Sequence, residues 1–261
     1  MKKIIIILLA VLQCVTLAAQ EPRRVKTVSV KDGAKAPYVY TFSYNADGSL
    51  AKISSRDNAI IFSSEGNEMT VVTDLKKYGK TSEKWVADSS KSTISCRRDW
   101  QNGSNDYTII RFNVAGNKIV RENSYSSFFK KWETYNRWDW NAAGNLVSIT
   151  DSANWPYKAK YGVKKYICPS VDVLTFIIAQ HVDAFATLQN FIDWVHHAPA
   201  GMELKPMTLL PTYISSGNEM TFTLWTLDAK GYIKSVKTRQ VYGADENSRP
   251  FIVTYTVTYE D

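Results

Sequence analysis

A short turn phrase recurs four times in this sequence, and it constrains the fold more than any other feature. Each copy has an aromatic or large apolar residue before Asn or Asp, a glycine three positions after that polar residue, and an apolar residue soon after the glycine. Asn and Asp bond their side chains to nearby backbone groups, and glycine adopts positive φ without steric cost. The phrase therefore predicts a β-hairpin turn between two strands. The copies are YNADGSL from Tyr44, FNVAGNKI from Phe112, WNAAGNL from Trp140 and LDAKGYI from Leu227.

The four copies stand at irregular intervals, so the sequence lacks the fixed period of a solenoid or propeller. Two further phrases, FSSEGNEMTVV from Phe62 and YISSGNEMTFTL from Tyr213, share the letters GNEMT and predict another pair of related hairpins. The pattern therefore indicates hairpins separated by insertions. The expected turn residues are Asn45 and Gly48, Asn113 and Gly116, Asn141 and Gly144, and Asp228 and Gly231.

Aromatic and β-branched residues alternate with polar residues around these turns. In YVYTFSY, at 38–44, the aromatic residues fall on one side, and in FIVTYTVTY, at 251–259, the threonines share one side. Alternation with period 2 is typical of strands that have one buried and one exposed face. The sequence therefore predicts a mainly β protein, with an antiparallel β-meander forming a curved sheet or partial barrel.

One segment breaks the strand pattern. From 171 to 197, apolar side chains recur at steps of three and four residues, which predicts a helical insertion made of one long helix or two short ones. Ser170 can cap its start, and Pro199 can end it. We expect the insertion to cover an otherwise open side of the sheet. The predicted organisation is one β-rich domain at 20–261, with meander hairpins at 36–166, the helical insertion at 170–198 and C-terminal hairpins at 207–261.

The first residues, MKKIIIILLAVLQCVTLAAQ, have the layout of a secretory signal peptide: two lysines, an apolar run and a stretch of small residues. We predict a signal peptide at 1–19, export through the Sec pathway, and a periplasmic, secreted or cell-surface location. Lipid attachment at Cys14 is not expected, because Val11-Leu12-Gln13 supplies no small residue before it. No other apolar run approaches the roughly 20 residues of a spanning helix, so no transmembrane helix is predicted.

The formal net charge is +7 at pH 7, and two of these charges lie in the predicted signal peptide. This mild excess is spread evenly, and it is consistent equally with affinity for acidic surface polysaccharide or lipid headgroups and with a contribution to solubility alone. Nucleic acid is not expected as a partner of an exported protein. After removal of the signal peptide, Cys96 and Cys168 remain, and the sequence leaves open whether they form a disulfide or stay as two free thiols.

Few residues suggest catalysis. The three histidines are His181, His196 and His197, and the adjacent pair would point about 100° apart on a helix, so neither a metal site nor a cofactor is predicted. No nucleophile elbow, zinc-protease motif, phosphate loop or dinucleotide fingerprint occurs. The two carboxylates that cleave a glycoside are brought together by folding, so their spacing in the sequence does not identify them. Candidates for such a pair are Asp88, Asp99, Asp106, Glu133 and Asp139, and no two of them are favoured by their spacing.

The stretch from Tyr125 to Tyr166 is rich in aromatic residues, which offer flat apolar area for sugar rings at low entropy cost. Trp132, Trp138 and Trp140 share strand parity, so they are expected on one face, as core or as a cross-strand ladder. Trp155, beside Pro156 in an expected loop, is the best candidate for an exposed contact. The candidate ligand-binding residues are Trp155, Tyr157, Trp138 and Trp140.

The export signal, the repeated hairpin turns, the helical insertion and the closing stretch LPTYISSGNEMTFTLWTLDAKGYIKSVK together resemble the DUF4595 family of Bacteroidetes envelope proteins. The turns are also distantly similar to those of YD-type repeat proteins. The resemblance covers about 36–261 and implies a porin-like β fold, with no assigned activity or catalytic residues. A pore is not implied, because charged residues interrupt the strands, as in KKWETYNRWDW at 130–140, whereas lipid-facing strand faces are apolar.

Three functions follow as hypotheses. The first is a non-catalytic binding or scaffold module at the bacterial envelope, with surface glycan as the ligand. The second is a glycan-directed hydrolase that uses a carboxylate pair in a cleft. The third is a lipid-binding half-barrel, with the predicted helical segment as a lid over an apolar cavity.

Overall fold

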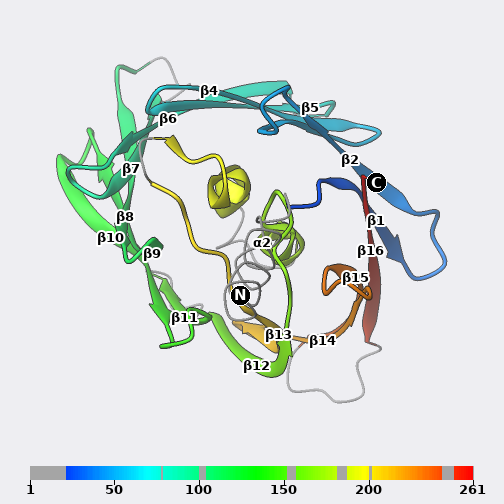
Figure 1. Cartoon of the computed structure of the whole chain (residues 1–261). Helices are drawn as coiled ribbons and strands as arrows, with labels where there is room; N and C mark the ends of the chain where they lie inside the picture. The colour runs from blue at the N-terminus through cyan, green and yellow to red at the C-terminus, as the bar shows by residue number, and fades with distance from the viewer. Residues whose placement is uncertain are drawn as a thin grey trace, which may run out of the picture.

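The computed structural model describes residues 22–77, 79–99, 104–151, 157–180, 187–199, 202–242 and 250–260. Within these residues sixteen antiparallel strands follow one another around a closed barrel (Figure 1). The strands are β1 (Val25–Asp32), β2 (Tyr38–Tyr44), β3 (Leu50–Ser54), β4 (Asn58–Glu65), β5 (Glu68–Leu75), β6 (Gly79–Asp88), β7 (Thr93–Asp99), β8 (Tyr107–Ala115), β9 (Lys118–Ser126), β10 (Lys131–Trp140), β11 (Leu146–Asp151), β12 (Tyr157–Lys165), β13 (Leu209–Ser216), β14 (Glu219–Leu227), β15 (Ile233–Tyr242) and β16 (Phe251–Tyr259).

The first and last strands close the barrel. β1 pairs with β16 along its length, with Val28 opposite Val257 and Val30 opposite Tyr255. The prediction of a mainly β meander is confirmed, but the predicted curved sheet or partial barrel is wrong, because this pairing leaves no open edge. Local turn and alternation patterns carry no signal for a contact between the two ends of the chain. The predicted signal peptide at 1–19 lies outside the described residues.

Three copies of the turn phrase have the same geometry. Gly48, Gly144 and Gly231 lie between consecutive strands at φ of 88°, 77° and 92°, and each amide donates to the carbonyl of the Asn or Asp three positions earlier. Positive φ is the backbone region that glycine adopts without strain. The same phrase therefore builds the same bend at three distant places in the barrel.

The remaining copy, FNVAGNKI from Phe112, forms its turn two residues later than the phrase predicts. Asn113 belongs to β8 and pairs with Arg121, so it is a strand residue and not the start of the turn. Gly116 and Asn117 form the turn, at φ of 57° and 64°. Two consecutive residues with positive φ are what a two-residue type I′ hairpin requires, and Gly-Asn supplies them at low cost.

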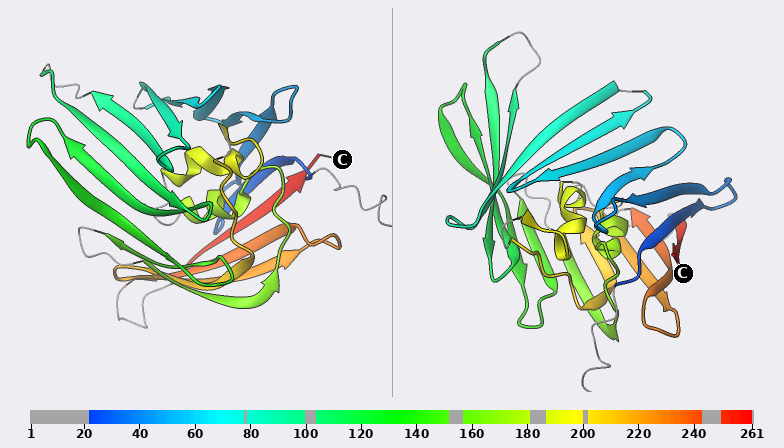
Figure 2. Two further views of the ribbon diagram at one scale, coloured as in Figure 1. Left: turned by 60° about the vertical axis from the view of Figure 1, so that its left-hand side comes forward. Right: turned by 45° about the horizontal axis from the view of Figure 1, so that its top comes forward.

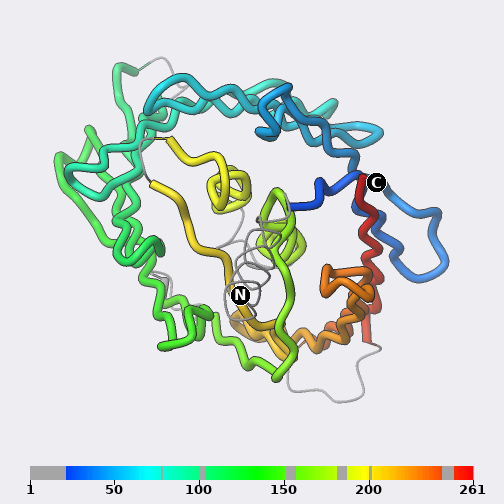
Figure 3. The backbone as a smooth tube through the Cα atoms, in the orientation of Figure 1, coloured from blue at the N-terminus to red at the C-terminus, as the bar shows by residue number. Residues whose placement is uncertain are grey.

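The helical insertion lies inside the barrel. After β12 the chain enters the lumen and forms α2 (Val173–Ala179) and the 3₁₀ helix η2 (Leu188–Val195), and it then returns to the wall at β13 (Figures 1 and 3). Two short helices were one of the predicted forms. The expectation that they cover an open side of the sheet is wrong, because the closed wall has no open side and the apolar faces of both helices are buried against its inner surface.

Aromatic contacts join the two helices to different parts of the wall. From α2, the Phe176 ring packs against Tyr40 and Phe42 of β2, at centroid distances of 5.1 and 5.3 Å. From η2, the Phe191 ring lies 5.0 Å from Trp85 of β6 and 5.8 Å from Phe112 of β8. Edge-to-face pairs at these distances add to the free energy gained by burying the rings. The lumen is therefore a packed core.

The outer wall carries polar side chains on several strands, beside exposed apolar side chains such as Phe222 and Leu224 of β14. Thr254, Thr256 and Thr258 of β16 point outward, since Val253, Tyr255 and Val257 between them are buried in the lumen core. On the neighbouring outer faces of β5 and β6, Lys84 and Glu68 form an ion pair at 2.6 Å. A transmembrane barrel has the opposite arrangement, with an apolar outer band and a polar lumen.

Packing of η2 against the wall gives the first prediction. Replacing Phe191, which is 2% exposed, by Ala should lower the free energy of unfolding by about 3–5 kcal/mol, because it leaves a cavity among three aromatic rings. Leu224→Ala, at a side chain that is 68% exposed on the wall, is the control and should change it by less than about 0.5 kcal/mol. Denaturant titration of both variants measures the difference, and equal values would show that η2 is not packed in the lumen.

Candidate functional site

The structure places most of the predicted ligand-binding residues in the core. Trp138 and Tyr157 are only 3% and 1% exposed, so both side chains belong to the core, which is one of the two arrangements expected for Trp138. Trp140 is half-buried against the same core, and its Nε1 donates to the Ile119 carbonyl at 2.8 Å. Trp155 lies outside the described residues, and its role stays a prediction.

A β-bulge in β10 separates tryptophans that were predicted to share a face. In the pairing of β9 with β10, Thr134 lies opposite Asn123 and Asn136 lies opposite Glu122, so Tyr135 is an extra residue. One extra residue reverses the inward and outward alternation of a strand. Trp138 consequently points into the lumen, whereas Trp132 is 43% exposed on the outer wall. The predicted common face therefore holds for Trp138 and Trp140, which both pack against the core, and fails for Trp132.

Trp132 belongs to a ladder of aromatic rings on the outer wall. Tyr125 of β9 lies directly opposite Trp132 of β10, with ring centroids 5.3 Å apart and an interplanar angle of 44°. Tyr107 of β8 continues the ladder, 6.2 Å from Tyr125 at 41°. The three rings come from three neighbouring strands, so the sheet fixes their spacing. They form a continuous aromatic surface on the outside of the barrel.

Arginines from the same outer face lie against the ends of this ladder. The Arg97 guanidinium carbon is 3.9 Å from the centroid of Tyr107, and that of Arg111 is 4.3 Å from the centroid of Trp132. Guanidinium groups stack on aromatic faces and keep donors free for anionic partners. Arg97 also donates to Asp99 at 2.8 Å. We call the set of Arg97, Tyr107, Arg111, Tyr125 and Trp132 the outer platform.

Hydrogen-bonding side chains continue the outer platform along the strands. Asn123 of β9 donates its Nδ2 to Oδ1 of Asn113 at 2.7 Å, and Thr134 of β10 donates to Oδ1 of Asn123 at 3.3 Å. Because these groups bond to one another across β8, β9 and β10, their positions are fixed before any ligand arrives. Flat rings, cations and preset polar groups together suit a ligand with both apolar faces and polar edges.

Acidic residues inside the barrel are held by structural contacts. Glu83 of β6 forms an ion pair with Arg98 of β7 at 2.7 Å and accepts from Trp85 Nε1 at 3.1 Å. Glu122 of β9 accepts from Asn136 Nδ2 at 2.6 Å. Burial raises the pKa of Glu122, while the Asn136 bond and the charge of Arg98 act in the opposite direction. These carboxylates face the packed lumen rather than an open cleft.

Three pockets of the described chain bear on the hydrolase hypothesis, and none of them supports it. A hydrolase of this type needs two carboxylates roughly 5–10 Å apart in a cleft. The pocket between η2 and β9 includes Asp172 as its one acid, the pocket between β2–β5 and Gln180 includes none, and the pocket beside the β14–β15 turn includes Asp228 alone. None of these three sites can hold the required pair.

The spaces between the helices and the wall are small. The first of these pockets has a cavity volume of about 50 Å³ and the second about 170 Å³. Ligand pockets usually measure about 300–1,000 Å³. Neither of these two spaces, among the described residues, is the large apolar cavity that the lipid-binding half-barrel requires.

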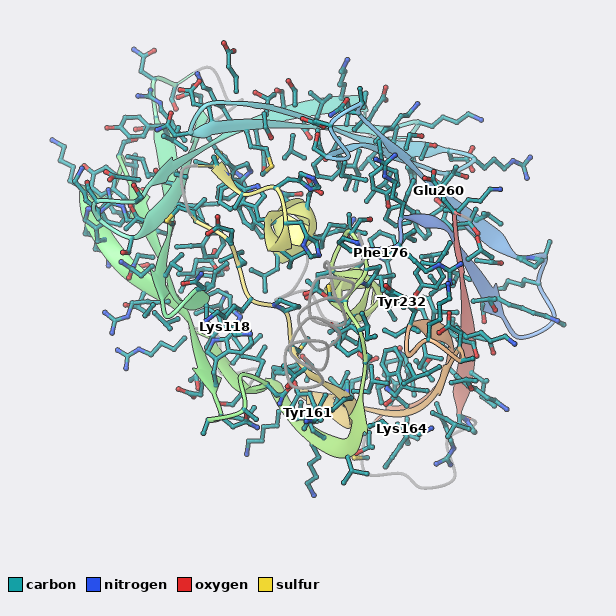
Figure 4. The ribbon with its side chains drawn as sticks, in the orientation of Figure 1. Lys118, Tyr161, Lys164, Phe176, Tyr232 and Glu260 are labelled. Carbon is teal, nitrogen blue, oxygen red and sulfur yellow. The ribbon has the colours of Figure 1, made fainter. Side chains whose placement is uncertain are left out.

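Lys118 of β9 lies beside the smaller pocket and hydrogen-bonds to the segment that leads from η2 back to β13 (Figure 4). Its Nζ donates to the carbonyls of Gly144, Lys205 and Pro206 at 3.0, 2.5 and 3.0 Å, and it lies 4.5 Å from the centroid of Trp140. Burial lowers the pKa of Lys118 to about 8, while the carbonyl oxygens and the ring favour the ammonium form. All three ammonium hydrogens have acceptors, so we assign this lysine a structural role.

The histidines and cysteines do not assemble a chemical site. His196 bonds through Nε2 to the Pro169 carbonyl at 3.0 Å, and His197 bonds through Nδ1 to Asp193 at 3.2 Å. His181 lies outside the described residues. Cys96 and Cys168 are both free thiols. In the described ranges, no cluster of three or more His, Cys, Asp or Glu side chains is placed to hold a metal ion, and no helix has the length and apolarity to cross a membrane.

Two solved structures share this fold at low sequence identity. A porin-like protein from Bacteroides uniformis ATCC 8492 superposes with a TM-score of 0.60 and 12% identity, over 92% of this chain and 98% of that one. A porin-like protein from Bacteroides vulgatus ATCC 8482 superposes with a TM-score of 0.54 and 13% identity, over 90% and 99% of the two chains. No protein-family model and no curated protein matches the sequence.

Fold and site together define a class of protein. The chain is a closed barrel whose lumen is packed with its own helices and whose outer wall carries the outer platform. Within that class it has the fold of the Bacteroides porin-like proteins. Sequence reasoning identified the aromatic stretch that contains Tyr125 and Trp132, but three of the residues it selected, Trp138, Trp140 and Tyr157, pack in or against the core. The two arginines were missed because they come from strands outside it.

The raised pKa of Glu122 predicts a pH dependence of stability. The folded protein holds this proton more tightly than the unfolded chain, whose usual pKa is 4.5, so the free energy of unfolding should fall as the pH rises above 4.5. Glu122→Gln removes this titration and keeps an acceptor for Asn136. The stability of the variant relative to the unmodified protein should therefore rise from pH 4.5 to neutral pH. Glu133→Gln, at an exposed side chain, is the control, and urea titrations that give parallel pH curves for both variants would contradict the assignment.

Proposed function

We propose that this protein is an exported, non-catalytic binding module of the bacterial cell envelope, and that the outer platform binds acidic surface polysaccharide. The observation that carries the proposal is the ladder of Tyr107, Tyr125 and Trp132, with an arginine stacked at each end. Aromatic faces suit the apolar faces of sugar rings, and guanidinium groups suit carboxylate or sulfate substituents. The neighbouring amide and hydroxyl groups suit sugar hydroxyls.

The rest of the molecule supports a binding role better than a transport role. Within the described residues, buried side chains of the helices and the wall fill the lumen, and the outer face of β16 carries hydroxyl side chains where lipid would require apolar ones. The fold shared with porin-like proteins from Bacteroides fits an envelope protein. The resemblance to the DUF4595 family and the predicted Sec signal peptide point to the same location.

Removal of the ring at the Arg111 end of the outer platform tests the proposal. Trp132→Ala should weaken retention on an acidic polysaccharide gel by about tenfold, because it removes one stacking face and one partner of Arg111. Its melting temperature should stay unchanged, since Trp132 is 43% exposed. Tyr213→Ala is the matched control, because Tyr213 is another outer-wall ring that packs on Phe222 and has Lys160 above it. Unchanged retention of the Trp132 variant, or equal loss in the control, would reject the assignment.

The arginines predict a dependence on salt. Attraction between exposed charges is screened over about 10 Å at 0.1 M salt, so retention on the acidic gel should fall as salt is added. The double variant Arg97→Gln and Arg111→Gln should bind more weakly at low salt and should lose most of this salt dependence. Affinity electrophoresis with acidic and neutral polysaccharide measures both effects. Equal salt dependence in the variant and the unmodified protein would contradict recognition through these two residues.

A further inference from the structure

The turn between β9 and β10 exposes two adjacent phenylalanines. Phe128 and Phe129 are 61% and 65% exposed, and their rings pack edge to face with centroids 5.0 Å apart. The Phe129 amide donates to Ser126 Oγ at 3.3 Å, and Lys130 takes a φ of 52°, so the turn has a defined backbone geometry. Large exposed apolar side chains that lie together mark interaction sites on soluble surfaces.

The phenylalanines lie at the end of a hairpin that projects beyond the helices of the lumen (Figure 2). Behind the two rings, the exposed side chains are first basic and then aromatic along β10. Lys130 and Lys131 follow the two rings, and Trp132 and Tyr135, 43% and 52% exposed, come next along β10. Apolar rings at the tip, with lysines, tryptophan and tyrosine behind them, match the layers of a bilayer interface, where Trp and Tyr concentrate at headgroup level.

We propose that this tip inserts into an anionic lipid surface. An aromatic side chain buries about 150–250 Å² when fully covered, so two rings fall well short of the roughly 800 Å² per partner of a stable protein interface. A bilayer has no such requirement for a large complementary surface, and apolar insertion combined with basic residues gives reversible binding. A protruding tip with two rings therefore suits a membrane better than a folded partner.

The charges behind the tip favour anionic headgroups. Among the described residues, no carboxylate lies within ion-pairing distance of Lys130, and Lys131 pairs with Glu133 at 2.5 Å. Arg111 lies on the outer face near Trp132 and adds a cation at the level expected for headgroups. Basic residues close to an anionic membrane each contribute to binding within about a Debye length of its surface. Insertion of the tip would bring the outer platform to the headgroup layer.

This inference does not rest on the proposed polysaccharide binding. Phe128 and Phe129 lie outside the outer platform, so lipid binding and polysaccharide binding can be lost separately. The test uses the chain without its predicted signal peptide and measures cosedimentation with vesicles of equal parts phosphatidylglycerol and phosphatidylcholine. Vesicles of phosphatidylcholine alone measure the contribution of headgroup charge.

The double variant Phe128→Ser and Phe129→Ser should partition onto the anionic vesicles at least about tenfold more weakly than the unmodified protein, with an unchanged melting temperature and unchanged retention on acidic polysaccharide. The matched control removes two exposed apolar side chains from the wall of β14, as Phe222→Ser and Leu224→Ser, which are 42% and 68% exposed. This control should bind vesicles like the unmodified protein.

A second variant tests the role of charge without altering the rings. Lys130→Ser and Lys131→Ser should weaken binding to the anionic vesicles and leave the weaker binding to phosphatidylcholine alone unchanged. Failure of the unmodified protein to bind anionic vesicles, or equal binding by the phenylalanine variant, would overturn the proposal. Equal loss in the β14 control would also overturn it, because binding would then follow general surface apolarity.

Discussion

Packing of aromatic side chains between the lumen helices and the wall is the interaction on which the rest of this structure depends. A barrel of sixteen strands encloses more space than its own inward side chains can fill, whereas eight strands give an interior that side chains fill by themselves. Phe176 packs against β2, and Phe191 packs between Trp85 and Phe112 of more distant strands. These contacts turn the lumen into a hydrophobic core, and they allow the outer wall to carry polar side chains.

In the described residues, side chains of the helices and the wall fill the lumen, and the candidate site lies on the outer wall. The helices take the space that a pore or a large lipid cavity would need, and the small pockets beside them offer no carboxylate pair. The outer wall at β7 to β10 is different, since it combines rings, guanidinium groups and preset amides on a rigid sheet. The projecting tip at Phe128 and Phe129 extends the same region, so polysaccharide and lipid binding would both use one side of the molecule.

The candidate site shows where sequence patterns stop being informative. Strand parity predicted one face for Trp132, Trp138 and Trp140, and the extra residue Tyr135 in β10 reversed the parity between Trp132 and Trp138. A bulge depends on the pairing of β10 with β9, so the strand itself carries no mark of it. Arg97 was missed for a related reason. Its contact with Tyr107 exists because β7 and β8 are neighbours, and neither residue belongs to a recognisable motif.

The sequence by itself determined the local structure: the bends at Gly48, Gly144 and Gly231, the alternation of the strands, and the helical character of the insertion. These features follow from backbone preferences and hydrophobic periodicity, which act over a few residues. Tertiary structure alone decided that β1 meets β16, that the insertion enters the lumen, and which aromatic residues face water. These features depend on contacts between residues far apart in the chain. Local patterns allow several arrangements equally, and the free energy gained by burying apolar surface selects one of them.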